Sequence, residues 1–279
     1  MTEILETLAM LSVLVFVIGS MTSMGLSLKM DQLIAPLKNA KLVVLALLAN
    51  FILIPAIAYL ITLVMPLDES VEIGLILLST AAGAPFLPKL AEVAKGNVAF
   101  SVGLMVLLMV VTIIYLPLVL PLLLSGVEVS PWEIAKSLIL MMLIPLAIGL
   151  FINARYEEAA AKIQPTFGQA SNIALLVLMV LGLVLNFSSM IALVGSLGIL
   201  AGIIFIVAAL VVGYLLGGSE HGIKNVMGLG TAQRNISAAL VVAGQNFDAG
   251  VITYVMVIAI IGLVVLMPAA GELGKRSAE

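Results

Sequence analysis

The sequence predicts an all-α polytopic membrane protein with nine transmembrane helices. Of its 279 residues, 63% are hydrophobic and only 10% are charged, whereas a soluble domain carries about 25% charged residues. The mean hydropathy is +1.31, and apolar stretches recur at lengths near the roughly 20 residues that cross a hydrocarbon core. We therefore expect residues 1–279 to form a single transmembrane domain embedded in a lipid bilayer.

The apolar stretches follow one another with only short polar connections between them. The predicted spans run over about 4–28, 41–65, 71–94, 99–124, 132–153, 166–187, 191–217, 222–245 and 250–267. The first span lacks the short apolar region and the small-residue cleavage site of a removed signal peptide. We therefore expect it to be retained as a transmembrane helix.

Charged residues orient these spans. Basic residues gather on one side: Lys29, Lys38, Lys41, Lys95, Arg155, Lys162, Lys224, Lys275 and Arg276. The opposite side is acidic apart from Lys136, and holds Glu3, Glu6, Asp68, Glu69, Glu72, Glu128, Glu133 and Asp248. The positive-inside rule then places the N-terminus outside and the C-terminus in the cytoplasm, which agrees with an odd number of spans. We expect an integral protein of a prokaryotic plasma membrane.

The composition argues against several classes of function. Without cysteine and with His221 as the single histidine, the chain has no disulfide framework, thiolate site or multi-histidine metal site, and we expect no metal or cofactor. The net charge of −3 comes with no basic patch for nucleic acid. His221 lies at a membrane edge and no two aspartates face each other at depth, which argues against an intramembrane enzyme. No required protein partner is evident.

The third span carries a predicted helix break near its middle. Gly83, Pro85 and Pro88 fall within an otherwise apolar segment. Each proline lacks a backbone N–H and clashes with the preceding turn, and glycine adds backbone freedom. Other prolines in the apolar stretches are expected to produce simple kinks; these are Pro55, Pro117, Pro121 and Pro145.

The eighth span is the second predicted break, and it holds the most informative residue of the chain. Gly228 and Gly230 precede a polar run that contains Thr231, Gln233, Arg234 and Asn235. An arginine keeps its proton in practice, and placing it at the centre of a lone helix costs roughly 2.5–3.5 kcal/mol. An apolar chain therefore needs a polar cavity, a partner or a ligand for Arg234.

The two breaks are offset by five spans, and an odd offset inverts the topology of equivalent elements. Irregular backbone at membrane depth is tolerated only where it is buried in protein or lines a water-filled cavity. Inverted repeats whose discontinuous helices cross near the bilayer midplane are typical of secondary transporters. Lys89 adds a second cation near the first break, although it also stands three residues before Glu92 and could form a helical ion pair with it.

These motifs resemble the bile acid:sodium symporter family. The similar segments are Met24-Gly-Leu-Ser-Leu-Lys29, Asn50-Phe51, Ile54-Pro-Ala56, Ala94-Lys-Gly-Asn-Val-Ala-Phe-Ser101 and Gln233-Arg-Asn-Ile-Ser-Ala-Ala239. The resemblance covers essentially the whole chain, as a nine-helix form. It implies alternating access, a small organic anion as substrate, and two moving parts. The panel would comprise residues of about 4–28, 132–153 and 166–187, and the core those of about 41–124 and 191–267.

The sequence departs from the family where sodium would bind. The resemblance implies a Ser-Asn pair in the first broken helix, which falls here on Leu87 and Pro88. The serine that would follow one helix later is kept as Ser101, but the neighbouring threonine is Met105.

The second broken helix departs in the same way. The family's glutamate falls on Gly230, its glutamine falls on Arg234, and its glutamine before the crossing becomes Asn50. Most oxygen ligands are therefore absent, and a guanidinium would repel sodium at this place. In addition, no Asp or Glu lies at mid-depth in any predicted span, which disfavours a proton relay through a buried carboxylate.

We therefore predict a secondary transporter that moves a small organic anion by alternating access and is not coupled to sodium. The predicted substrate-binding residues are Arg234, Asn235, Gln233, Thr231, Lys89, Thr80, Asn50 and Ser101. Alternatively, the cations are structural and lock the crossing in the place of sodium. Two further alternatives remain: a sodium-coupled symporter as in the family, and a membrane sensor with a transporter fold.

Overall fold

The computed structural model describes residues 2–29, 38–124, 130–185, 193 and 196–276. Every regular element in these ranges is helical. Six helical stretches are long and apolar enough to cross a membrane: Thr7–Ser27, Ala40–Val64, Val98–Leu123, Pro131–Arg155, Gly198–Leu216 and Ala249–Arg276. The all-α membrane class predicted from composition is thus confirmed for the described part of the chain.

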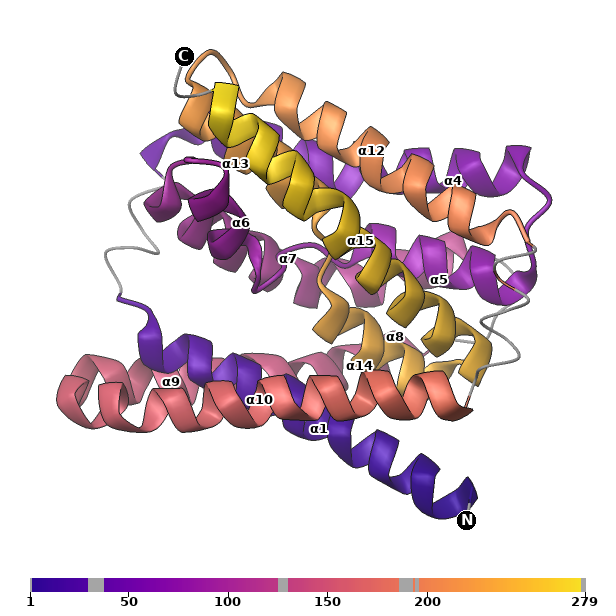
Figure 1. The fold of residues 1–279 in the computed structure, drawn as a ribbon, viewed down its shortest axis with the longest axis horizontal. Coiled ribbons are helices and arrows are strands. Elements are labelled where there is room, and N and C mark those ends of the chain that lie inside the picture. The colour runs from indigo at the N-terminus through magenta and orange to yellow at the C-terminus, as the bar shows by residue number, and fades with distance from the viewer. Residues whose placement is uncertain (1, 30–37, 125–129, 186–192, 194–195, 277–279) are drawn as a thin grey trace.

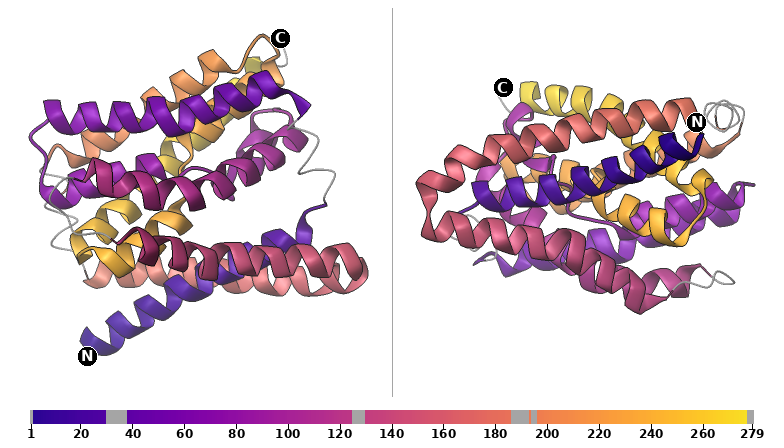
Figure 2. Two further views of the ribbon diagram at one scale, coloured as in Figure 1. Left: turned by 180° about the vertical axis from the view of Figure 1, so that it is seen from behind. Right: turned by 90° about the horizontal axis from the view of Figure 1, so that it is seen from below.

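One layer of the molecule is built from helices of the first and middle parts of the sequence. It contains α1 (Thr2–Ser27), α8 (Pro131–Leu138), the π-helical segment η3 (Ile139–Leu143), α9 (Ile144–Arg155) and α10 (Glu157–Leu185). Seen from below, α1 lies between α10 on one side and the continuous α8–η3–α9 helix on the other (Figure 2).

Glycines bring two helices of this layer together. A Cβ atom added to Gly25 of α1 would lie 2.4 Å from the carbonyl oxygen of Leu146 and 2.9 Å from Cα of Gly149 in α9. The two backbones therefore touch, as small residues allow between membrane helices. At the end of α1, Lys29 pairs with Glu157 at 2.6 Å, and this contact raises the pKa of Lys29 and lowers that of Glu157.

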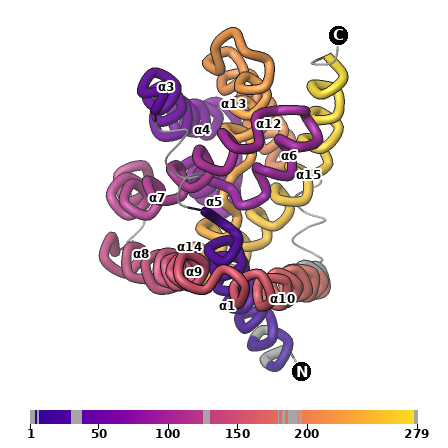
Figure 3. Tube along the Cα trace, turned by 90° about the vertical axis from the view of Figure 1, so that its left-hand side faces the viewer, coloured from indigo at the N-terminus to yellow at the C-terminus, as the bar shows by residue number. Residues whose placement is uncertain are grey.

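The remaining helices form a thicker body above this layer (Figures 1 and 3). Its unbroken helices are α3 (Ala40–Leu48) with η2 (Ala49–Leu53) and α4 (Ile54–Val64), then α7 (Val98–Leu123), α12 (Gly198–Leu216) and α15 (Ala249–Arg276). The start of α1 lies at the lower right of Figure 1 and the end of α15 at the upper left.

Two prolines expected to kink their helices are preceded by π-helical turns. The N–H of Ile54 donates to the carbonyl of Ala49, and the N–H of Ile144 donates to that of Ile139. Each wide turn ends at the residue before a proline, Pro55 or Pro145. The i→i+5 pattern widens the turn where a proline ring would otherwise press on the preceding carbonyl. By contrast, Pro117 and Pro121 lie inside α7.

The first interrupted helix is placed as the sequence predicts. Helix α5 (Glu69–Thr80) ends before an irregular segment at residues 81–86, and α6 (Leu87–Val93) follows. Pro85 lies in the irregular segment, and Pro88 lies in the first turn of α6, where its missing N–H has no helical partner to lose.

The second interruption begins later than predicted. Helix α13 (His221–Ala232) includes both Gly228 and Gly230, and only residues 233–235 separate it from α14 (Ile236–Asn246). The glycines serve packing instead of breaking the helix. At Gly228, an added Cβ would lie 3.1 Å from the carbonyl oxygen of Leu210. At Gly230, it would lie 2.9 Å from Cδ2 of Leu87.

Two span boundaries also differ from those predicted. Helix α10 begins at Glu157 instead of near 166, because the polar stretch before the apolar run is itself helical. Helix α15 continues to Arg276, with Pro268 inside it, instead of ending near 267. The predicted start of the seventh span near 191 lies largely outside the described residues.

Candidate functional site

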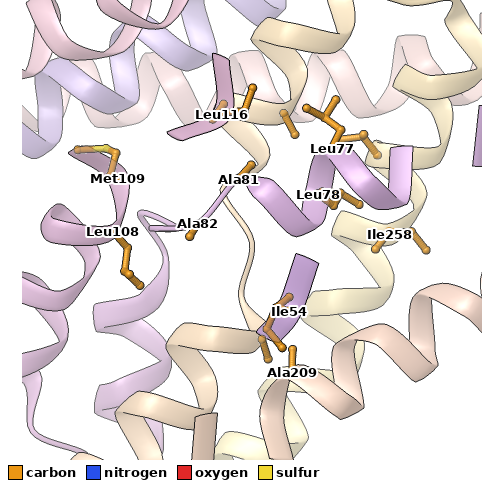
Figure 4. Packing of buried hydrophobic residues seen from close by; sticks show 14 of the residues in the cluster. Ile54, Leu77, Leu78, Ala81, Ala82, Leu108, Met109, Leu116, Ala209 and Ile258 are labelled. Carbon is orange, nitrogen blue, oxygen red and sulfur yellow. The ribbon is translucent and has the colours of Figure 1, made fainter. Parts of the chain in front are cut away.

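The two interruptions contact each other, and their contact is called the crossing here: residues 81–86 and 233–235. Asn235 joins the two segments. Its backbone N–H donates to the carbonyl of Ala81 (2.9 Å), and its Nδ2 donates to the carbonyl of Gly83 (3.0 Å). Its Oδ1 accepts the N–H of Ala238 (3.0 Å), which caps the start of α14. Figure 4 shows the apolar packing around Ala81 and Ala82.

Arg234 is buried at the crossing, with 4% of its surface exposed. Its Nε donates to the carbonyl of Leu78 (2.9 Å), and its Nη2 donates to that of Ser79 (2.7 Å). Its Nη1 donates to Oδ1 of Asn50 (2.8 Å) and to the carbonyl of Thr231 (2.9 Å). Four of the five guanidinium N–H donors are therefore used by the protein itself.

The backbone acceptors of Arg234 come from the ends of two helices. Leu78 and Ser79 lie in the last turn of α5, and Thr231 lies in the last turn of α13. Carbonyls of a last turn have no partner within their own helix, and each helix end carries roughly half a negative charge. Two such ends offset about one positive charge, which explains how a guanidinium is accommodated without a carboxylate.

Asn50 completes this arrangement from the π-helical segment η2. While its Oδ1 accepts from Arg234, its Nδ2 donates to the carbonyl of Ala46 (3.0 Å) and to Oγ1 of Thr231 (3.3 Å). Both residues are buried. Arg234, Asn50, Thr231 and Asn235, four residues singled out in the sequence, are thus brought together by hydrogen bonds at the crossing.

Thr112 of α7 holds the first interruption and was not identified from the sequence. Its Oγ1 accepts the N–H of Ala82 (2.9 Å) and donates to the carbonyl of the same residue (3.0 Å). Gly83 follows with φ +82°. The hydroxyl replaces helical partners that the irregular backbone has lost. A threonine in the otherwise apolar middle of the helix after the break is the only signal that the sequence offers for it.

Substituting Gly83 by alanine is expected to destabilise the protein by about 2–5 kcal/mol, since a left-handed backbone and overpacking each add to the cost. An added Cβ would lie 2.2 Å from the backbone nitrogen of Met109. Thermal unfolding in detergent measures the effect. Gly218→Ala is the matched control, because Gly218 has φ +78° but open space around it. Equal losses in the two variants would contradict the close approach to α7.

The other predicted polar residues make different contacts. Thr80 donates within its own helix to the carbonyls of Ile76 and Leu77 (3.2 and 2.9 Å). Ser101 is buried and donates to the carbonyl of Val98 (2.7 Å), also within its own helix. Oε1 of Gln233 and Oγ of Ser237 are buried and have no hydrogen-bond partner among the described residues.

Lys89 is exposed, whereas Arg234 is buried. Its side chain is 58% exposed and pairs with Glu92 at 2.8 Å. The helical ion pair weighed in the sequence is therefore present, and the structure does not bring this cation into the hydrogen bonds of the crossing.

The substitution Lys89→Gln is expected to leave both the unfolding temperature and substrate transport unchanged. An exposed ion pair three residues apart contributes only about 0.3–0.5 kcal/mol. Transport by purified protein in liposomes, compared with the wild type, tests this expectation. A strong loss of transport in a variant of normal stability would show that Lys89 contacts the substrate.

A cavity of about 590 Å³ lies between the layer that contains α1 and the body that contains α14 and α15. The side chains that line it are apolar, with one exception. They include Met10 and Val13 of α1, Leu178 of α10, and Val241 of α14, and Gln245 is the one side-chain amide among them. Such a cavity suits an apolar ligand body better than a densely charged one.

Among the described residues, no group of three or more His, Asp or Glu side chains could hold a metal ion. The polar groups of the crossing are instead amides, hydroxyls and backbone carbonyls arranged around one guanidinium. These groups join the two interrupted helices around one buried charge.

Membrane proteins in which discontinuous helices meet are typically secondary transporters. The family model of the Sodium Bile acid symporter family matches residues 13–193. The chain belongs to this family, which is a family of transporters and not of enzymes. The match ends before the second interruption, so Arg234 lies outside it.

Curated relatives are distant. The chain is 26% identical over 197 residues to the "Probable sodium/metabolite cotransporter BASS3, chloroplastic" of Oryza sativa subsp. japonica. The aligned region covers 70% of this chain and 47% of the relative. The chain is 24% identical over 143 residues to the "Uncharacterized sodium-dependent transporter YocS" of Bacillus subtilis (strain 168). This aligned region covers 51% of the chain and 44% of the relative. The chain thus spans about half the length of the curated relatives it matches.

Proposed function

We propose that this protein is a secondary transporter that moves a small organic anion by alternating access without sodium coupling. The observation that carries this proposal is the set of four hydrogen bonds that Arg234 makes to groups of α5, α13 and η2. Oxygen atoms of α5, α13 and η2 converge at this place, and the guanidinium, a cation that belongs to the chain, occupies it. A sodium ion at the same place would lose these oxygens and be repelled by the guanidinium.

In this proposal Arg234 does not bind the substrate directly. It neutralises the C-terminal ends of α5 and α13, together with Asn50 and Thr231, and so takes the role of a bound cation. Four of its five N–H donors already bind the protein. This supports a structural cation that locks the crossing over a cation that binds the carboxylate of the substrate.

The substrate binds beside the crossing and in the cavity of about 590 Å³. The start of α14 supplies positive potential, because a helix N-terminus carries roughly half a positive charge. Ser237, whose hydroxyl oxygen has no partner among the described residues, offers an O–H donor near this helix start. The apolar walls would receive the body of the anion, and its charged head would face the positive helix end.

The movement follows from the two layers. The layer of α1, α8–η3–α9 and α10 corresponds to the panel, and the body with the crossing corresponds to the core, in nine spans with inverted repeats. The start of α1 and the end of α15 lie on opposite sides of the molecule (Figure 1), which agrees with termini on opposite sides of the membrane, and the positive-inside rule favours an external N-terminus. Rocking of the panel against the core would expose the cavity alternately to each side.

Replacing sodium by choline is expected to leave the transport rate unchanged in liposomes that contain the purified protein. Counterflow of radiolabelled 2-oxo-4-methylpentanoate, phenylpyruvate and taurocholate provides the measurement, since all three are anions with apolar bodies. Liposomes without protein correct for leakage. A strict requirement for sodium would overturn the proposal.

Sodium-coupled symport is the second candidate, because the names of the relatives include sodium. It requires an ion site other than the position of Arg234. The choline substitution separates the two candidates directly.

A further inference from the structure

The core of this protein contains a single buried charge among the described residues. Among the described residues, Arg234 is the only charged side chain in the buried class. The described Asp, Glu and His side chains are exposed, except for Glu72, which is half-buried in the first turn of α5. The positive charge at the crossing is therefore permanent and belongs to the chain.

A permanent charge behaves differently from a bound ion over a complete transport cycle. Arg234 keeps its proton, and it returns to its starting position with the protein after each cycle. Whatever charge it moves during one half of the cycle moves back during the other half. With no coupled ion, as proposed above, and no second anion carried back in exchange, the net charge transferred per cycle is the charge of the substrate alone.

We infer that transport by this protein is electrogenic, carries the uncompensated negative charge of the anion, and runs outward in a cell whose cytoplasm is negative. This inference rests on the proposed function and adds a direction to it. One elementary charge in a potential of 100 mV changes the equilibrium ratio of a monovalent anion by about 50-fold, from about 2.3 kcal/mol per charge. The protein would therefore export an organic anion from the cell. A transporter coupled to an inward ion gradient would instead import the anion.

Liposomes containing the full-length protein test this inference. They are loaded with radiolabelled 2-oxo-4-methylpentanoate, phenylpyruvate or taurocholate in sodium-free potassium buffer, and valinomycin sets the membrane potential through the potassium gradient. The steady-state ratio of external to internal anion is measured at inside-negative, zero and inside-positive potential. For a monovalent anion we expect a ratio near 1 at zero potential and shifts of about 50-fold, in opposite directions, at 100 mV of either sign.

The outcomes separate the inference from the proposed function. Sodium-independent counterflow with a ratio that does not respond to potential would overturn the electrogenic inference and leave the transporter proposal standing. Absence of counterflow for all three anions, or a sodium requirement, would overturn the proposed function. The cavity variant Gly244→Phe provides the control for flux through the protein, because Gly244 lines the cavity and an added Cβ meets no atom within 4 Å.

Discussion

Replacing Arg234 by methionine is expected to lower the free energy of unfolding by at least about 3 kcal/mol. Methionine fills part of the same volume but leaves three acceptors, on Ser79, Thr231 and Asn50, without their donor, whereas the carbonyl of Leu78 still accepts the N–H of Ala81 (3.3 Å). Each unsatisfied buried acceptor costs about 1–3 kcal/mol. The negative ends of α5 and α13 would in addition face each other without a cation. Thermal unfolding followed by size-exclusion chromatography in detergent measures the loss.

Two further substitutions keep this prediction testable if the methionine variant does not fold. Arg234→Lys retains the charge but lacks the planar fork of donors, so we expect an intermediate loss of stability. Arg234→Gln leaves a neutral side chain among the converging oxygens, and we expect sodium chloride, compared with choline chloride, to raise its unfolding temperature. Wild-type stability of Arg234→Met would show that the guanidinium does not hold the crossing together.

Filling the cavity at Gly244 by phenylalanine is expected to reduce transport by at least about tenfold, which corresponds to about 1.4 kcal/mol. Gly244 lines the cavity of about 590 Å³, and an added Cβ there meets no atom within 4 Å, so the side chain can extend into the cavity. Stability should be unchanged or slightly increased, because glycine in a helix interior is unfavourable by about 0.5–1 kcal/mol. Counterflow and thermal unfolding of the same preparation give both numbers.

Gly271→Phe is the matched control for the cavity variant. Gly271 also lies in a helix, α15, and an added Cβ would meet no atom within 4 Å, but the residue does not line the cavity. We expect it to retain wild-type transport. Equal transport by the Gly244 and Gly271 variants would show that the substrate does not pass through this cavity.

Several features of the fold could be predicted because side chains signal them. The apolar composition gives the membrane class, and Gly83 with Pro85 marks the first interruption, since both residues oppose a continuous helix. Arg234 could be recognised because charge at membrane depth requires compensation. Its position in the second interruption followed from the polar run around it.

What could not be predicted depends on the backbone. The acceptors of Arg234 on Leu78 and Ser79 are carbonyl oxygens, and every residue carries such an oxygen, so the sequence holds no trace of their role. Gly228 and Gly230 were misplaced because glycine serves both a break and a close helix contact. Lys89 was included as a site residue because sequence distance from the break does not determine exposure.

The guanidinium of Arg234 has a consequence for where such a protein can work. An ion taken from the surroundings occupies its site in proportion to its concentration, whereas a side chain is present from the moment of synthesis. The stability of the crossing should therefore be the same in salty and in fresh surroundings. Under the proposed sodium-independent transport, a cell in a habitat poor in sodium would not need a sodium gradient to use this protein, but it would also lose the control that such a gradient gives over the direction of flow.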